Sequence, residues 1–255
     1  MPTISTTVIS VCQIYIPSTE AKTRSVLTTV AEQNDLSFVV LVQFVSEKTL
    51  QVEYSCTGSL ISRQHVLTAK ACFKQDLKNV RRIEVLIQSM NFKTEKKYYP
   101  MVWMDYQNWA RLNPKQAIVP KFDHDEIMII KLKDAVTEKY VKIAELSSKT
   151  SGEINTFDLK PQFAGWSTVR SKESIKAVDL LSKTSCQISI KSFYETELCA
   201  RHISGLGKDD IGGPLLYKDK KILGILVSLC ESTHCYDVFA SIDPYRNFIN
   251  KYKLV

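Results

Sequence analysis

The sequence predicts an all-β fold that ends in one α-helix. Strand-like runs rich in Val, Ile and Leu recur along the chain and are bounded by polar turn residues. Helical periodicity is clear only near the C-terminus. Many short strands with few helices are typical of a β-sandwich or a β-barrel. The chain has 255 residues, a length that all-β proteins often reach as a single unit.

Six runs are expected to form strands because aliphatic residues dominate them and polar residues follow. They cover residues 38–44, 66–69, 82–88, 127–132, 187–190 and 221–229. The helix is expected to begin near Asp243, with Asp243 as its N-cap and Pro244 in its first turn. One face of this helix is apolar and carries Tyr245, Phe248, Ile249 and Tyr252.

The chain carries a formal net charge of +7, from 34 basic and 27 acidic residues. This excess favours acidic partners such as sulfated glycans, anionic membranes or acidic proteins, although a solvated basic surface is its plainer interpretation. Nucleic acid is not expected as a partner, because the lysines are scattered without interleaved arginine and aromatic residues. No run of ~18 apolar residues occurs, so no membrane-spanning helix is expected.

Seven cysteines indicate disulfides rather than a metal or redox site. No Cys-x-x-Cys motif is present and the four histidines lack metal-ligand spacing, so no metal or cofactor is expected. Disulfides indicate an oxidising compartment and therefore secretion. The odd cysteine, Cys12, lies in an apolar stretch over residues 6–16 that is either a leader or an ordered extension. Gln13 interrupts this stretch and no positive residue precedes it.

Five segments resemble trypsin-like serine proteases and occur in the order of that family. Residues 56–72 read CTGSLISRQHVLTAKAC, where the family has two bridged cysteines and the ending Thr-Ala-Ala-His-Cys. Residues 210–216 read DIGGPLL and resemble the family's Asp-Ser-Gly-Gly-Pro-Leu-Val. The other three are residues 126–132 (EIMIIKL), 164–166 (AGW) and 222–228 (ILGILVS). The resemblance covers residues 24–252.

The resemblance implies two six-stranded antiparallel β-barrels packed face to face, followed by the C-terminal helix. It divides the chain into a leader or pro-segment over residues 1–24 and a trypsin-like domain over residues 25–255. The implied disulfides are Cys56–Cys72, Cys186–Cys199 and Cys230–Cys235. The last pair is expected because the cysteine that usually bridges to this loop is replaced by Gly207.

The catalytic positions of the family are replaced. Its histidine corresponds to Ala71, its serine to Ile211 and its aspartate to Glu126. Alanine cannot take a proton and isoleucine has no nucleophilic atom, while Glu126 has no histidine to orient. The neighbouring Lys70 is not expected to reach the position of the histidine. Asp125 is interpreted as part of an acidic loop face rather than as a substitute base.

The positions that would bind the substrate are also changed. Asp209 stands where the family has the glycine whose backbone N–H holds the oxyanion, and a carboxylate there opposes a developing negative charge. Gly205 stands at the base of the specificity pocket, where trypsin-like enzymes have an aspartate. We therefore expect neither oxyanion stabilisation nor a preference for basic side chains.

The activation site is degenerate as well. Family members are cleaved after a basic residue, here Arg24, and the new N-terminus pairs with the aspartate that corresponds to Asp210. The segment that follows begins with Ser25 and reads SVLT instead of Ile-Val-Gly-Gly. It lacks the apolar plug and the two glycines that permit insertion. Asp210 is therefore expected either to find another partner or to stay exposed beside Asp209, because a buried unpaired carboxylate is costly.

The resemblance therefore predicts a secreted, non-catalytic serine protease homologue with a binding or regulatory role. Such a protein acts as a cofactor or decoy in a protease cascade, or in a defence or venom-type secretion. Its expected partner is a protein, namely a protease, a protease inhibitor or a cascade substrate. An anionic glycan is a further candidate, for a basic patch formed by Arg81, Arg82, Lys93, Lys96 and Lys97. The alternatives are an endopeptidase with substituted catalytic residues and a passive secreted component.

Overall fold

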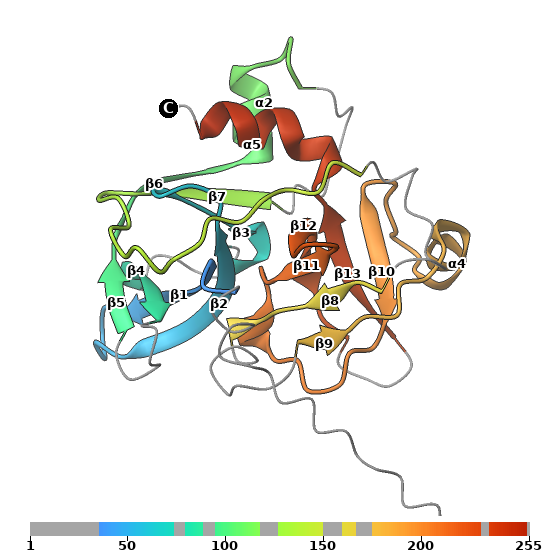
Figure 1. Ribbon diagram of the computed structural model, residues 1–255, viewed down its shortest axis with the longest axis horizontal. Helices are drawn as coiled ribbons and strands as arrows, with labels where there is room; N and C mark the ends of the chain where they lie inside the picture. The colour runs from blue at the N-terminus through green and yellow to red at the C-terminus, as the bar shows by residue number, and fades with distance from the viewer. Residues whose placement is uncertain are drawn as a thin grey trace, which may run out of the picture.

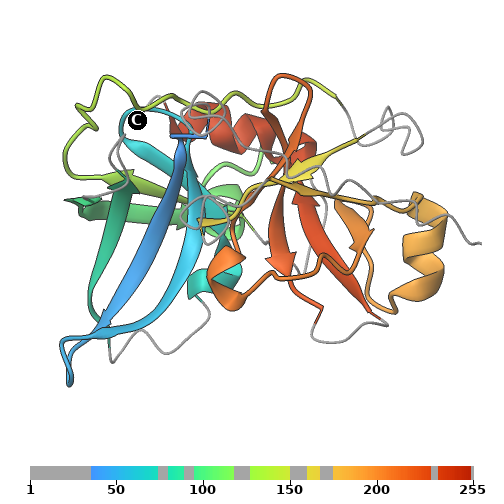
Figure 2. The same cartoon turned by 60° about the horizontal axis from the view of Figure 1, so that its bottom comes forward.

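A computed structural model describes residues 36–73, 80–88, 95–117, 127–149, 160–166, 175–230 and 235–253. Two antiparallel β-sheets lie side by side, the first built from the N-terminal half of the chain and the second from the C-terminal half (Figures 1 and 2). The predicted all-β class and the arrangement in two curled sheets are confirmed. No helix in the described part of the chain is long and apolar enough to cross a membrane.

The first sheet has seven strands rather than the six expected. They are β1 (Val39–Ser46), β2 (Val52–Leu60), β3 (His65–Ala69), β4 (Val80–Gln88), β5 (Glu95–Tyr98), β6 (Pro100–Asp105) and β7 (Ile127–Leu132). Their order is β5-β4-β1-β2-β3-β7-β6, so β5 and β6 occupy opposite edges. Only Tyr99 separates β5 from β6 along the chain. One bent segment therefore connects the two edges, and its break at Tyr99 explains the additional strand.

The second sheet has the six strands expected. They are β8 (Gln162–Phe163), β9 (Lys176–Ala177), β10 (Glu197–Arg201), β11 (Pro214–Tyr217), β12 (Lys221–Ser228) and β13 (Tyr236–Ser241). Their order is β10-β13-β12-β11-β8-β9. An antiparallel bridge between Leu180 and Ala200 joins the segment after β9 to β10, and the Leu181 N–H donates to the Cys199 carbonyl at 3.0 Å. These contacts join the two edges of the sheet.

The C-terminal helix begins where the sequence predicts. A 3₁₀ turn, η5 (Asp243–Tyr245), leads into α5 (Arg246–Tyr252), and Tyr245, Phe248 and Ile249 are buried as expected. The Asp243 side chain does not cap the turn and instead lies 3.5 Å from the Arg246 guanidinium. Phe248 packs against Trp109 of α2 (Tyr106–Leu112), with ring centroids 5.5 Å apart.

The predicted strand over residues 187–190 is wrong, because this segment belongs mainly to helix α4 (Lys183–Ser189). The Ser182 side chain caps the helix by accepting a hydrogen bond from the Ser185 N–H at 3.2 Å. Ile188 is 82% exposed, so the alternating Gln-Ile-Ser-Ile pattern does not reflect burial of one face. The local capping signal, not the alternation, determines the structure here.

All three predicted disulfides are present. The Cα atoms lie 6.1 Å apart in Cys56–Cys72, 5.9 Å apart in Cys186–Cys199 and 5.4 Å apart in Cys230–Cys235. These separations are within the usual range for a disulfide. Cys12 lies outside the described residues. The three bridges indicate that the chain folds in an oxidising compartment.

The largest group of packed, buried side chains extends across both barrels. It fills the first barrel, and it includes Ile222 and Ile225 of β12 in the second barrel and Phe248 of α5. A second, smaller group around Phe163 and Phe239 fills the second barrel. Because one core spans the boundary between the barrels, their relative position is fixed by close packing.

Gly212 is required where the two barrels meet. Its φ angle is +86°, in the left-handed region that favours glycine. A Cβ atom at this position would lie 2.2 Å from the Thr57 carbonyl oxygen and 2.3 Å from the Thr68 Oγ1. The chain therefore needs glycine here both for its conformation and for the close approach of the second barrel to β2 and β3.

We expect Gly212→Ala to lower the free energy of unfolding by about 3 kcal/mol or more, because it combines a left-handed conformation with a backbone clash. The matched control is Gly207→Ala, since Gly207 has a φ of −125° and no atom within 4 Å of an added Cβ. The control should change stability by less than about 0.5 kcal/mol. Guanidinium denaturation of both variants measures the difference, and equal stability of the two would contradict the assignment.

Candidate functional site

A cleft of about 630 Å³ opens between the two barrels. Its wall from the first barrel comes from β2 and from the 3₁₀ turn η1 (Lys70–Phe73), and its wall from the second comes from the turn η4 (Lys208–Asp210) and the end of β12. The lining side chains are mainly apolar or small, with Ser55, His202, Lys208, Asp209 and Ser228 as the polar members. The cleft brings together Ala71, Asp209 and Ile211, three of the positions that the sequence singled out.

Ala71 lies in η1, directly before the disulfide-bonded Cys72, and contributes only a methyl group to the cleft. Lys70 does not take the place of a base beside it. The Lys70 ammonium lies 3.9 Å from the Asp105 carboxylate, which also caps helix α2. The expectation that Lys70 points away from the histidine position agrees with this ion pair.

Ile211 follows directly after η4, and both of its backbone polar groups are used within the protein. Its N–H donates to the Lys208 carbonyl at 3.2 Å, and its carbonyl accepts from the Thr57 N–H at 2.8 Å. In a trypsin-like enzyme the N–H at this position is one of the two oxyanion donors. Here the carbonyl of Lys208 occupies that donor, so it is not available to a ligand in this conformation.

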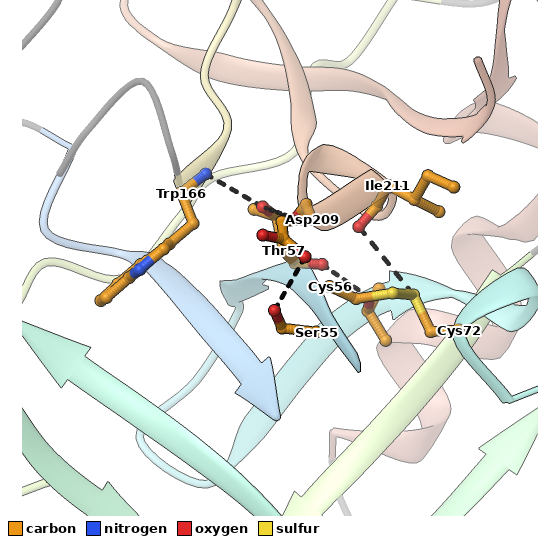
Figure 3. Close-up of a disulfide and its surroundings, with 8 residues drawn as sticks. Ser55, Cys56, Thr57, Cys72, Trp166, Asp209 and Ile211 are labelled. Carbon is orange, nitrogen blue, oxygen red and sulfur yellow. Dashed lines mark hydrogen bonds between the residues drawn. A yellow bond between two sulfur atoms is a disulfide. The ribbon is translucent and has the colours of Figure 1, made fainter. Parts of the chain in front are cut away.

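Asp209 holds η4 against the first barrel. Its Oδ1 accepts a hydrogen bond from the Ser55 hydroxyl at 2.8 Å, and its carbonyl accepts one from the Thr57 hydroxyl at 2.7 Å. The Thr57 hydroxyl in turn accepts from the Trp166 N–H at 2.9 Å, as Figure 3 shows. The carboxylate at the predicted oxyanion position is therefore part of a contact between the barrels.

Asp210 is fully buried and has found a partner within the turn. Its Oδ2 accepts from the Gly207 N–H at 2.9 Å. Its Oδ1 lies where a side chain on Gly165 would be, 1.9 Å from an ideal Cβ, so residue 165 must be glycine. Asp210 is therefore buried rather than exposed beside Asp209. Arg24 and Ser25, the predicted activation site, lie outside the described residues.

The sequence did not reveal a buried carboxylate beneath the cleft. Asp237 of β13 has no exposed surface and accepts from the N–H groups of Ile203 and Cys230, both at 2.7 Å. The His202 Nδ1 lies 3.8 Å from this carboxylate, and His202 lines the cleft. The only sequence signal was a lone aspartate between Cys235 and the apolar residues of β13.

Four further observations complete the site. Gly205, at the expected base of the specificity pocket, is exposed with a φ of +83°, while the neighbouring Leu206 lines the cleft. Burial, with a smaller contribution from Glu53, raises the pKa of Tyr54 to about 12, so this cleft residue is a neutral phenol at physiological pH. The predicted aspartate position, Glu126, lies outside the described residues. No group of three metal-ligating side chains occurs in the described ranges.

The comparisons with known proteins agree with this geometry. The family model described as Trypsin matches residues 26–249. Mast cell protease 2 of Meriones unguiculatus is 27% identical over 223 residues, which cover 77% of this chain and 78% of the relative. A venom protease of Bombus pensylvanicus is 29% identical over 177 residues, covering 64% of this chain and 69% of the relative.

Among solved structures, kallikrein-related peptidase 10 in complex with Zn²⁺ superposes with a TM-score of 0.60. The superposition covers 86% of this chain and 96% of that structure, at 21% sequence identity, so this likeness concerns the fold alone. The family match extends over both barrels and ends within the C-terminal helix. The chain therefore belongs to the trypsin family of serine proteases.

Proposed function

We propose that this trypsin-family chain is a secreted, non-catalytic binding protein that holds a protein partner in the cleft between its barrels. The partner is a protease, a protease inhibitor or a substrate of a protease cascade, and the chain acts on it as a cofactor or decoy. The observation that carries the proposal is Ile211 at the position of the nucleophile, with its N–H bound to the carbonyl of Lys208.

The chemistry of the cleft supports the loss of catalysis. Acyl transfer needs a nucleophile, a base beside it and donors for the oxyanion. Ile211 offers only an alkyl group, and Ala71 offers only a methyl group. The nearby candidates are already engaged, since Lys70 pairs with Asp105 and the Ser55 hydroxyl donates to Asp209. Removal of a triad as a unit typically costs about 10⁶-fold in kcat.

The shape of the cleft supports retained binding. The cleft stays open at about 630 Å³, although its catalytic groups have been replaced. Its lining combines apolar surface from Leu206, Val227 and Leu229 with a few polar groups, a composition typical of ligand sites. The relatives are proteases by name, and partners of such enzymes are protein substrates and inhibitors. The three disulfides support secretion.

Two alternatives remain distinct from this proposal. An endopeptidase with substituted residues would need a serine and a base in contact within the cleft. A passive secreted component would need no partner at all. The two experiments below separate the three functions.

The first experiment tests catalysis. We expect no covalent labelling by a fluorophosphonate and no cleavage of a broad peptide library, because no nucleophile lies at the reacting position. The double variant Ile211→Ser with Ala71→His should stay near background. Adding Asp209→Gly should raise the labelling rate by about tenfold or more, since the turn that occupies the oxyanion donor is anchored through Asp209.

The control for this series is Asp209→Gly alone, which changes the turn without supplying a nucleophile and should remain unlabelled. Activity of the unmodified protein would overturn the proposal if it copurifies with the chain and disappears in Lys70→Ala or Glu126→Gln. Such a result would identify an endopeptidase with substituted residues.

The second experiment tests partner binding. Ser228 is exposed at the end of β12 and lines the cleft, so Ser228→Arg should fill the cleft without disturbing the core. The matched control is Ser189→Arg, at an exposed serine on α4 that does not line the cleft. Each protein is immobilised and exposed to the native fluid, and retained proteins are identified by mass spectrometry.

We expect a protease, an inhibitor or a cascade substrate to bind the unmodified protein and the Ser189→Arg variant. The Ser228→Arg variant should lose at least about 90% of the bound partner. One obstructing side chain at the centre of an interface lowers the binding free energy by several kcal/mol. Equal retention by all three proteins would show that the cleft is not the binding site. No retention by any of them would favour a passive component.

A further inference from the structure

A second groove of about 430 Å³ lies on the first barrel, away from the cleft. Its seven lining residues come from the start of β4 and from the bend between β5 and β6: Val80, Arg81, Arg82, Ile83, Tyr99, Pro100 and Trp103. None of these residues lines the cleft between the barrels. We refer to this site as the β4–β6 groove, and the proposed function does not involve it.

The β4–β6 groove lies between two strand edges. Strand β4 pairs with β5 only from Val85 to Gln88, so in the described part of the chain its first residues pair with β1 alone. Strand β6 forms the other edge of the sheet and pairs with β7. Tyr99 is the one residue between β5 and β6 along the chain, and both strands lie at the left of Figure 1. Extended peptides are commonly bound beside such edges.

The floor of the groove is apolar and unusually exposed. Trp103 is 41% exposed and Tyr99 is 45% exposed, whereas the other two tryptophans, Trp109 and Trp166, are buried. Met101 and Val102 on the same strand are also exposed, at 56% and 39%, but do not line the groove. Exposed large apolar side chains gathered in one groove, as Trp103 and Tyr99 are, are characteristic of an interaction site. Tryptophan contributes strongly to such sites when it is covered.

The rim of the groove is positively charged. Arg81 and Arg82 line the groove. Lys97 of β5 lies beside Arg82, because both side chains contact the Glu84 carboxylate. Lys97 lies 2.8 Å from it and Arg82 lies 2.5 Å from it. Glu84 is buried, so Arg82 and Lys97 share one shielded carboxylate, while Arg81 is exposed on the rim. The predicted basic patch is therefore partly neutralised. Lys96 pairs with Glu138 at 2.5 Å, and Lys93 lies outside the described residues.

We propose that the β4–β6 groove binds an extended acidic segment of a partner protein through one aromatic or large aliphatic side chain. The apolar residue would pack on Trp103 and Tyr99 between the strand edges, and the acidic residues would pair with Arg81 and Arg82. A sulfated glycan fits less well, because five of the seven lining residues are apolar or aromatic and the cations are partly neutralised by Glu84. Dense sulfate needs the opposite composition, many free cations on a polar surface.

The probe is an acetylated eight-residue peptide with one central phenylalanine flanked by glutamate and aspartate. Binding is measured by calorimetry at low salt, and acrylamide quenching of tryptophan fluorescence reports its position, because Trp103 is the exposed tryptophan of the three. We expect the peptide to protect Trp103 from quenching. Replacing its phenylalanine with alanine should weaken binding by about tenfold or more, the effect of losing one buried anchor.

The variants separate the apolar and the charged contributions. Arg81→Glu and Trp103→Ala should each weaken peptide binding by about tenfold or more. Arg81 is exposed, so its reversal is not expected to affect folding. The matched control is Lys218→Glu, the same charge reversal at an exposed lysine of the second barrel, and it should change the affinity by less than about twofold. Ser228→Arg in the cleft should also leave peptide binding unchanged, so failure of this proposal and failure of the proposed function are distinguishable.

Three results would overturn the proposal. The first is no peptide binding at millimolar concentration. The second is binding that Lys218→Glu weakens as much as Arg81→Glu does, which would indicate a general effect of net charge. The third is a heparin hexasaccharide that binds more tightly than the peptide and depends on Arg81 but not on Trp103, which would assign the groove to a glycan.

Discussion

Thr57 is the point on which the arrangement of the two barrels depends. Its N–H donates to the Ile211 carbonyl, its hydroxyl donates to the Asp209 carbonyl and accepts from the Trp166 N–H, and its carbonyl accepts from the Thr68 hydroxyl. Thr57 is fully buried, so water cannot reach its polar groups. Each group therefore needs a hydrogen-bond partner within the protein. A single residue of β2 thereby fixes the turn that carries the nucleophile position of the family.

This network shows that the junction of the barrels depends on structural contacts rather than on catalytic groups. The residues that define the junction of the barrels are structural, namely Gly212 against the Thr57 carbonyl, Gly165 against the buried Asp210, and the Cys56–Cys72 bridge. None of them needs a nucleophile or a base nearby. Asp209 even adds a contact, because its carboxylate reaches Ser55 of the other barrel. A change that would harm an oxyanion site is therefore compatible with a firmly held turn.

The sequence predicts those parts of the molecule that depend on spacing and on family order. The three disulfides, the C-terminal helix and its buried Tyr245–Ile249 face follow from such signals and are confirmed. Helix α4 was missed because a two-residue alternation outweighed the Ser182 cap. Asp237 and the bond that occupies the Ile211 N–H could not be predicted, since both depend on backbone groups brought together by tertiary structure. Glu126 and the activation segment stay predictions.

A row of aromatic side chains joins the two surfaces to which binding is assigned. Tyr54 lines the cleft and stacks on Phe44 at 4.3 Å, Phe44 meets Phe73 at 5.3 Å, and Phe73 meets Trp103 of the β4–β6 groove at 5.5 Å. Packed rings resist compression, so this row holds the two surfaces at a fixed separation. The first-barrel side of the cleft and the β4–β6 groove therefore belong to the same rigid part of the first barrel. Its rigidity depends on the buried core, so both proposed binding surfaces rest on the same packed part of the protein.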